Sequence, residues 1–336
     1  MENGETGLSI IIPVYNVKDY LERCVNSVLA QAFQAYELIM IDDGSTDGSS
    51  ELCDDLAEKD TRIRVLHQQN RGQSHARNIG IKEARGTFIT FVDSDDWIES
   101  RMYEELFYAI EKFNSDIAIC RLQMVNAPGD VAKIIGYNKE LVLDRTEATK
   151  EILRDDMIPS FPVNKIYRRE LFDGIEFPVG RIFEDTATIY KVFYRASTVV
   201  TVPYIGYNYW QNPNGTCKTK HQDIHKKLER ELHNALAFDE RYVFAKNHKD
   251  LNEVVPLCAF KAYQMIRSFI HMLKHKGYSL NKEQQKTVDD IMKTFDTKDL
   301  VDFTWFEKLD LYMYRLSKPM LNFYLSIIPM FHRMRE

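Results

Sequence analysis

The chain has 336 residues, a formal net charge of −6, 44% hydrophobic and 28% charged residues. This length suits one large folded core with an appended region, and the composition excludes fibrous and disordered classes. Because the net charge is negative and the first two thirds of the sequence contain no stripe of lysine and arginine, no nucleic-acid partner is expected.

Cysteine usage and the N-terminal residues indicate the cytoplasm. The five cysteines are scattered, odd in number and without a Cys-x-x-Cys pair, which favours reduced thiols over a disulfide framework or a zinc site. The opening MENGETGLS has no basic head followed by an apolar run, so no secretory signal is expected. No uninterrupted apolar stretch reaches the length of about 18 residues that a membrane-spanning helix needs.

The first third of the sequence alternates short apolar runs with amphipathic stretches. Residues 8–14 are nearly all apolar and β-branched, which predicts a strand buried on both faces. Residues 17–29 repeat apolar side chains at helical spacing, and Asn16 or Asp19 could cap that helix. Further along the chain we expect a strand at 36–41, a polar turn at 42–47, a helix at 49–58, a strand at 62–67, a helix at 73–84 and a strand at 87–92.

This alternation predicts an α/β fold with a doubly wound, mostly parallel sheet flanked by helices. Ligands bind such sheets at the carboxyl ends of the strands. Three polar clusters lie at these ends, and they are Tyr15-Asn16, Asp42-Asp43 and Asp93-Ser94-Asp95-Asp96. We therefore expect one site where the three clusters converge.

The rest of the sequence predicts two further regions. A helix at 102–113 and an extended stretch at 116–125 continue the first domain, whereas beyond about His221 the chain becomes helical through 224–246 and 254–274. We divide the chain into a first domain over 1–220 and a helical C-terminal region over 221–336. The first domain has one half at about 8–100 and a second half at about 101–220.

The C-terminal region ends in a segment with a mixed composition. Residues 311–336 interleave aromatic, aliphatic and basic side chains, and two prolines interrupt them. This pattern is typical of an element that touches a membrane surface without crossing it. The helical region could also supply a homodimer surface.

Asp93 and Asp95 offer two carboxylates directly after a predicted buried strand. Carboxylate oxygens suit Mg²⁺ or Mn²⁺, which substrate phosphates and water usually complete. An Asp-Ser-Asp triplet also forms ordinary turns and caps. The triplet alone leaves both interpretations open, and its position after the strand favours the metal.

Four blocks carry a family resemblance, and they are SIIIPVYN at 9–16, IDDGSTD at 41–47, NRGQSHARN at 70–78 and FVDSDD at 91–96. In order and spacing they resemble the glycosyltransferase family 2 enzymes with a GT-A fold, especially bacterial enzymes that build surface polysaccharides. The resemblance implies a UDP-sugar donor and Mn²⁺ or Mg²⁺. It also implies a nucleotide-binding set of Pro13, Tyr15, Asn16, Asp43, Gly72, Arg77, Asn78, Asp93 and Ser94.

The resemblance also implies individual roles. Tyr15 would stack on the uracil ring, and the Asp43 carboxylate would accept its imide proton. Arg77 would pair with phosphate or fix Asp43. Asp95, with help from Asp93, would bind the metal that bridges the diphosphate.

Several of these residues have a structural alternative. Tyr15 could simply pack, and Arg77 could pair with a neighbouring acid. We expect Asp42 to be a turn residue and Asp47 to cap the following helix. His75, on a helix beside Arg77, is expected at the surface or behind the site.

The resemblance implies that the domain at 1–220 is catalytic, with a nucleotide-binding half at about 8–100 and an acceptor half at about 101–220. A second acidic cluster, Glu184-Asp185, lies in the acceptor half. In the resembled family an acidic pair at this distance supplies the general base that deprotonates the acceptor hydroxyl. We assign Asp185 as that base, with Glu184 as the substitute. The alternative is an N-cap on a helix at 186–193, and the two roles can coexist.

Two further positions are candidate donor or acceptor contacts, namely Lys165 and Trp210. Trp210 stands where relatives often carry an arginine in a late loop that closes over the diphosphate. It could stack on a sugar or fill the core. The late-loop cations that could replace the arginine are Lys218, Lys220 and His221.

The sequence therefore predicts an inverting, metal-dependent transfer of one sugar from a UDP-sugar to a hydroxyl of a glycan acceptor. We expect a lipid-linked oligosaccharide of capsule or exopolysaccharide synthesis at the cytoplasmic face of the membrane. Two alternatives are transfer to a protein-linked glycan and a catalytically silent sugar-nucleotide scaffold. A nucleotidyltransferase is less favoured, because residues 13–16 are not a glycine-rich phosphate loop.

Overall fold

The computed structural model describes residues 7–127, 129–212, 223–276 and 279–301, with 303, 304, 307, 308, 311 and 312. These residues form two compact units, one within 1–221 and one within 222–336. In the first unit the strands are β1 (Leu8–Val14), β2 (Tyr36–Asp42), β3 (Ile63–His67), β4 (Phe88–Phe91), β5 (Trp97–Ile98), β6 (Ile117–Ala127), β7 (Asp130–Ile135), β8 (Leu141–Asp144), β9 (Lys165–Arg168) and β10 (Thr198–Trp210). Its helices are α1 (Lys18–Leu29), α2 (Ser49–Lys59), α3 (Gln73–Glu83), α4 (Met102–Phe113), α5 (Arg145–Arg154) and α6 (Ile189–Arg195), with a 3₁₀ turn at Arg169–Phe172.

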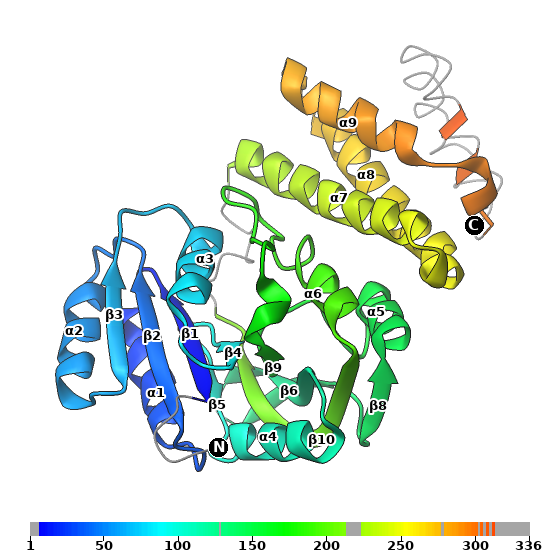
Figure 1. The fold of residues 1–336 in the computed structure, drawn as a ribbon. Helices are drawn as coiled ribbons and strands as arrows, with labels where there is room; N and C mark the ends of the chain where they lie inside the picture. Colours follow the sequence, from blue (N-terminus) through cyan, green and yellow to red (C-terminus); the bar gives the residue numbers. More distant parts are fainter. Residues whose placement is uncertain are drawn as a thin grey trace. The chain divides into compact units, whose positions relative to one another are not determined.

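The strands form one mixed sheet in the order β3-β2-β1-β4-β9-β6-β10-β5 (Figure 1). Two further strands pair at its side, β7 with β6 and β8 with β10. The strands β1 to β4 are parallel neighbours. Because β9 runs antiparallel to both β4 and β6, and β10 is parallel to β6, the strands β6 and β10 point the same way as β1. The predicted α/β fold with a mostly parallel sheet is therefore confirmed.

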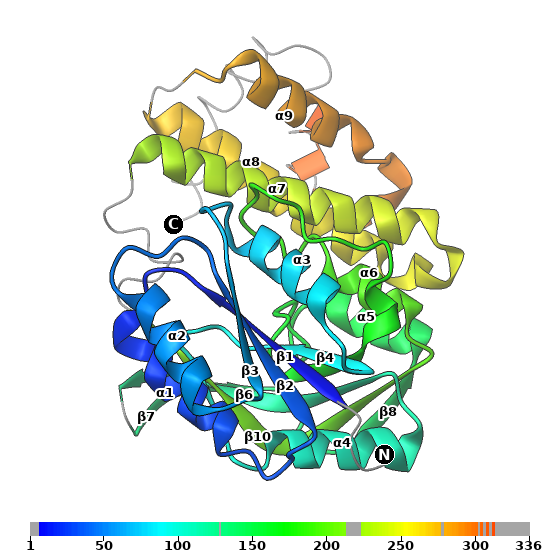
Figure 2. The same cartoon turned by 60° about the vertical axis from the view of Figure 1, so that its left-hand side comes forward.

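Helices cover both faces of the parallel half of the sheet. Helices α1 and α2 lie on one side of β1 to β3, and α3 lies on the other (Figure 2). Strands β1 and β2 are buried along their whole length, as their apolar sequences predict. A Cβ at Gly80 of α3 would lie 2.3 Å from the Ile11 side chain, so glycine allows this helix to pack closely on β1.

The acceptor half contains elements that the sequence pattern did not indicate. Strands β7, β8 and β9 and helix α5 lie between the predicted stretch at 116–125 and β10, and all three strands run antiparallel to their neighbours. The prediction of a helix at 186–193 is wrong about the residue at which the helix begins. Helix α6 begins at Ile189, and Thr188 occupies the cap position.

The second unit is helical in its described part. It contains α7 (Ile224–Asn247), α8 (Val255–Lys276), α9 (Lys282–Thr294) and 3₁₀ turns at Lys249–Val254 and Thr297–Asp299. The Tyr242 hydroxyl donates to Asp299 (2.8 Å) and its ring stacks on Phe295, which ties α7 to the chain after α9. Among the described residues no helix is both long and apolar enough to span a bilayer. The predicted membrane-touching tail, apart from residues 311 and 312, lies outside the described residues.

Candidate active site

The strand order reverses at β1, because β2 and β3 continue to one side of it and β4 lies on the other. Loops that leave the carboxyl ends of β1, β2 and β4 diverge there, which is where open α/β sheets bind ligands. Pro13 lies in β1 beside Ile41 of β2, and Tyr15 follows β1 with 47% of its surface exposed. Asn16 turns the chain with a positive φ of 51°, and its side-chain oxygen accepts from the Thr46 amide (2.8 Å). The Tyr15 ring is therefore open to a ligand at the switch point.

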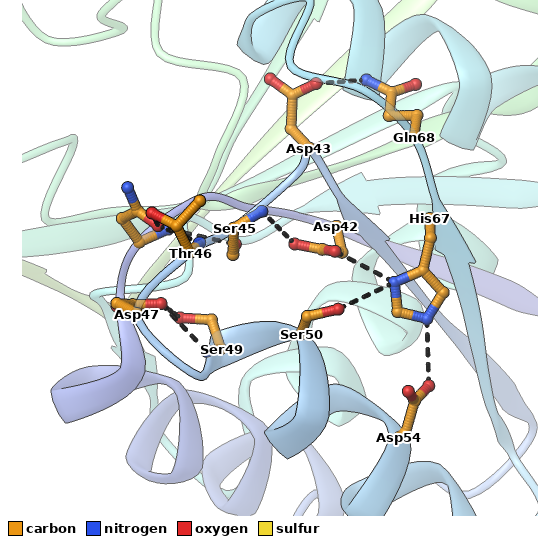
Figure 3. Close-up of polar contacts among 11 residues, drawn as sticks. Asp42, Asp43, Ser45, Thr46, Asp47, Ser49, Ser50, Asp54, His67 and Gln68 are labelled. Carbon is orange, nitrogen blue, oxygen red and sulfur yellow. Dashed lines mark hydrogen bonds and ion pairs between the residues drawn. The ribbon is translucent and has the colours of Figure 1, made fainter.

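The adjacent carboxylates of Asp42 and Asp43 point in different directions (Figure 3). Asp42 accepts from the Ser45 amide (3.0 Å), so it is a turn residue as expected. Its other oxygen lies 3.0 Å from His67 Nδ1. Hydrogen bonds from Ser45 and His67 lower the pKa of Asp42 although burial opposes this, and the contact with Asp42 is the main cause of the raised pKa of His67. This network fixes the β2 end without using Asp43.

Asp43 organises the loop between β3 and α3. Its carboxylate accepts from Gln68 Nε2 (2.6 Å) and from the Arg71 (2.8 Å) and Gly72 (2.8 Å) amides. Gly72 has φ 87° and ψ 162°, a region that is accessible essentially to glycine alone. A carboxylate offers about four acceptor positions, so Asp43 retains one for a ligand N–H. His75 contacts Gln68 (2.8 Å) behind this carboxylate.

The Asp47 carboxylate ties the starts of two helices together. It accepts from the Ser49 amide at the start of α2 (2.9 Å), as predicted, and from the Lys18 amide at the start of α1 (3.0 Å). The polar turn after β2 therefore holds α1 in place as well as α2.

Arg77 of α3 connects the two acidic clusters. It is 2% exposed, and its guanidinium donates to Asp93 (2.9 Å) and to Glu184 (2.5 Å), while it lies 5.5 Å from the centre of the Phe177 ring. Burial alone would lower the pKa of Arg77, but the carboxylates of Asp93 and Glu184 raise it. The alternative in which Arg77 pairs with neighbouring acids is the arrangement that the structure shows.

Glu184 and Asp185 follow Phe183, which adopts a left-handed conformation with φ 62°. A non-glycine residue in this region is strained, and such strain concentrates at functional sites. The Asp185 carboxylate accepts from the Thr186 amide (2.6 Å). Burial, together with the adjacent Glu184 charge, raises the pKa of Asp185 to about 7. A carboxylate with this pKa is suited to remove a proton at neutral pH.

In the acidic turn after β4, the carboxylates of Asp96 and Asp95 have different partners. Asp96 is 1% exposed and accepts from the Tyr207 hydroxyl (2.6 Å) and the Trp210 amide (2.7 Å), so it anchors β10. Asp95 is half-buried and accepts from the Asn212 side chain (2.9 Å). Burial raises the pKa of Asp95, and the charge of Asp93 adds to this effect.

This turn fits a divalent cation. The described residues contain no cluster of three or more His, Cys, Asp or Glu side chains with metal-binding geometry, and Asp93 and Asp95 are the carboxylates that this turn would offer. Mg²⁺ and Mn²⁺ are commonly held by one or two carboxylates and completed by phosphate and water. Arg77 pairs with Asp93, whereas burial and the Asp93 charge raise the pKa of Asp95. A cation bound at Asp95 would favour its charged form.

Three residues that were predicted to contact a ligand make local structural contacts in this structure. Lys165 is fully buried, and its ammonium donates to four oxygens of the 159–164 segment at 2.8 to 3.4 Å, so in this structure it holds that segment. Asn78 exchanges two hydrogen bonds of 2.8 Å with the Phe177 backbone. Trp210 lies beside Trp97, with 6.4 Å between ring centres. Ser94 is buried within the turn, and Lys218, Lys220 and His221 lie outside the described residues.

Comparisons with known proteins identify the family. Residues 9–175 match the family model of Glycosyl transferase family 2. The uncharacterized glycosyltransferase EpsJ of Bacillus subtilis is 33% identical over 252 residues, which cover 73% of this chain and 73% of EpsJ. Glycosyltransferase GlyA of Streptococcus pneumoniae is 34% identical over 57% of this chain, but the match spans only 29% of GlyA.

Solved structures share the fold. S. aureus TarS 1–349 in complex with UDP matches with a TM-score of 0.68 and 20% identity, over 98% of this chain and 92% of that one. A mannosyltransferase from Pyrobaculum calidifontis in complex with GDP-Man and Mn²⁺ matches with a TM-score of 0.52 and 16% identity, over 90% and 89%. At these identities the likeness concerns the fold alone.

The strand order that reverses at β1 and the likeness to the solved structures define a GT-A fold. The family match and the extent of the likeness to EpsJ make the assignment specific. The chain belongs to glycosyl transferase family 2.

Proposed function

We propose that this glycosyltransferase moves a single sugar, with inversion, from a UDP-sugar to a hydroxyl of a glycan acceptor. The observation that carries the proposal is the Arg77 bridge. One buried guanidinium contacts both Asp93 of the acidic turn and Glu184 beside Asp185. The carboxylates of the acidic turn and the candidate base therefore belong to one charge network, which agrees with a direct displacement between donor and acceptor in a single site.

The nucleotide end of the site favours a uracil base. The exposed Tyr15 ring offers a stacking surface, and Asp43 keeps one acceptor position for an imide N–H. The TarS structure of the same fold contains UDP, which agrees with this choice.

Asp95, with Asp93, would hold Mn²⁺ or Mg²⁺ at the diphosphate. When bound, the ion neutralises charge that builds up on the leaving nucleoside diphosphate. The neighbouring Asn212 amide orients the Asp95 carboxylate. Such support from a second residue typically sharpens metal affinity.

Asp185 would remove the proton of the acceptor hydroxyl as the oxygen attacks the anomeric carbon. Its raised pKa keeps it basic enough to accept that proton near neutral pH. Inversion follows from a single displacement from the opposite face of the sugar, which needs no covalent enzyme intermediate. Glu184 is held by Arg77 and adjusts the basicity of Asp185 through its charge.

A thermal-shift panel of UDP-, GDP- and dTDP-sugars, with and without Mn²⁺, tests the donor site. A ligand that binds only the native state raises the unfolding temperature according to its affinity and concentration. We expect stabilisation by a UDP-sugar that depends on Mn²⁺ and disappears in Asp95→Ala. No shift with any nucleotide would refute the donor assignment and favour the silent scaffold.

The acceptor class is the second part of the proposal. We propose a lipid-linked oligosaccharide of capsule or exopolysaccharide synthesis, approached at the cytoplasmic leaflet through the basic and aromatic tail at 311–336. Co-sedimentation with anionic liposomes tests the tail. If a chain that ends at Asp310 binds the liposomes as well as the full chain does, the proposed membrane contact of the tail is wrong. Release of UDP without pyrophosphate during transfer would exclude a nucleotidyltransferase.

A further inference from the structure

Helix α1 is hydrogen-bonded along its length to the segment that follows β4. The contacts are Cys24 Sγ to the Asp93 carbonyl (3.6 Å), Arg23 Nη2 to the Asp95 carbonyl (2.6 Å), the Ile98 amide to Ser27 Oγ (3.1 Å) and Gln31 Nε2 to the Glu99 carbonyl (2.7 Å). Arg23 is the charged member of this series. The helix therefore places a guanidinium against the backbone of Asp95.

Two tryptophan rings hold the Arg23 guanidinium. Its central carbon lies 4.1 Å from the centre of the Trp97 ring and 5.4 Å from that of Trp210. A guanidinium stacks favourably on indole faces, and the contact is stronger where water is excluded. Because Trp97 and Trp210 come from β5 and β10, the fold determines the position of the charge before any ligand arrives.

Arg23 has few hydrogen-bond partners for a cation in this setting. Among the described residues it makes one hydrogen bond, to the Asp95 carbonyl, and its buried Nε has no partner there. Within the described residues no carboxylate lies within ion-pair distance of Arg23. Arg77, the other arginine at the acidic turn, is by contrast paired with two carboxylates. The Nη donors of Arg23 that do not bind the Asp95 carbonyl are therefore unpaired within the described part of the chain, and an anion could accept from them.

We propose, building on the proposed function, that Arg23 donates hydrogen bonds to the diphosphate of the bound donor. A guanidinium matches phosphate oxygens with parallel donors, and its fixed stack limits the entropy lost on binding. The sequence offers Trp210 where a late-loop arginine was expected. In this chain Trp210 instead packs on an arginine that α1 supplies, so the charge reaches the acidic turn from a different element.

Binding of UDP and of uridine, measured by calorimetry in EDTA, tests the proposal. Both ligands carry the base and ribose, only UDP carries the diphosphate, and EDTA removes any contribution from metal. We expect Arg23→Met to weaken UDP binding about tenfold, as loss of a charge-assisted hydrogen bond would do, and to leave uridine binding within twofold. Arg23→Lys should lose less for UDP, because the charge remains while the fork geometry is lost.

Arg62→Met is the matched control, since Arg62 also lies over an aromatic ring, Tyr36 at 4.6 Å, and pairs with Asp60. Arg62→Met should change neither the affinity for UDP nor the affinity for uridine. Equal weakening of UDP and uridine in Arg23→Met would overturn the proposal, because Arg23 would then only hold the turn. Unchanged UDP binding in both Arg23 variants would overturn it as well. If the wild type bound neither ligand, even with Mn²⁺, the proposed function itself would fail.

Discussion

Replacing Arg77 with methionine removes the cation that joins Asp93 to Glu184 and leaves most of the apolar contact with Phe177 in place. The two carboxylates then face each other with no buried positive charge between them. Breaking a buried ion pair by removing one partner is strongly destabilising, because the remaining charge is desolvated and uncompensated. Since the Arg77 side chain is 3% exposed, solvent cannot compensate the loss. We expect a loss of about 3–5 kcal/mol in the free energy of unfolding.

The loss should depend on pH in a defined direction. The positive charge of Arg77 lowers the pKa of Asp185, so removal of Arg77 raises this pKa further above about 7. A carboxyl group whose folded pKa exceeds its unfolded value contributes stability at low pH that is lost as the pH rises through the folded value. The deficit of Arg77→Met relative to the wild type should therefore be largest near pH 8 and shrink toward pH 5.

Urea unfolding followed by tryptophan fluorescence, at several pH values, measures both effects. Arg77→Met with Glu184→Gln should be more stable than Arg77→Met alone, because one unpaired charge is removed. Arg62→Met is the control and should lose no more than about 1 kcal/mol, as a partly exposed pair does. A loss below about 1 kcal/mol in Arg77→Met, or a deficit that grows toward low pH, would refute this account of the bridge.

Three further predictions concern the site. Asp185→Asn should lower the rate of transfer at least about a hundredfold and keep UDP-sugar affinity within twofold. The kcat/KM of the wild type should rise with pH to a plateau above about 7, and a flat pH profile would exclude Asp185 as the base. Gly72→Ala should destabilise the protein by about 1–3 kcal/mol in thermal unfolding through its positive φ alone, since a Cβ there meets no atom within 4 Å. Tyr15→Ala should leave stability within about 0.5 kcal/mol and weaken UDP binding in calorimetry by about 1–3 kcal/mol; unchanged affinity would mean that no base stacks on Tyr15.

The donor half could be predicted because its elements are determined by local patterns. The apolar run of β1 and the helical spacing of α1 are each readable within a dozen residues, and their observed bounds differ from the predicted ones by a residue or so. Parallel strands joined by short helices then allow few arrangements, so the polar clusters at the strand ends had to meet. The acceptor half lacks this regularity, because β9 enters between β4 and β6 in the opposite direction.

Lys165 shows how such an insertion changes the role of a residue. Asn164 precedes it in a left-handed conformation with φ 55°, and its side-chain oxygen joins three backbone carbonyls around the Lys165 ammonium. The sequence Val-Asn-Lys-Ile contains no pattern that indicates a buried cation surrounded by oxygens. The expected ligand contact of Lys165 rests on the resemblance of this segment to one in family 2 enzymes, where the lysine faces donor or acceptor.

The acidic turn shows the limit of local evidence most clearly. Asp95 and Asp96 are adjacent, have the same chemistry and follow the same strand, so no sequence pattern separates their roles. The fold separates them through partners more than a hundred positions away, because Tyr207 and the Trp210 amide occupy both oxygens of Asp96. Asp95 has only the Asn212 amide on one of its oxygens, so of these two carboxylates it is the one that we propose as a metal ligand. The same Trp210 that binds Asp96 through its backbone packs on Arg23 through its ring, so one residue of β10 contacts both the buried carboxylate and the neighbouring cation.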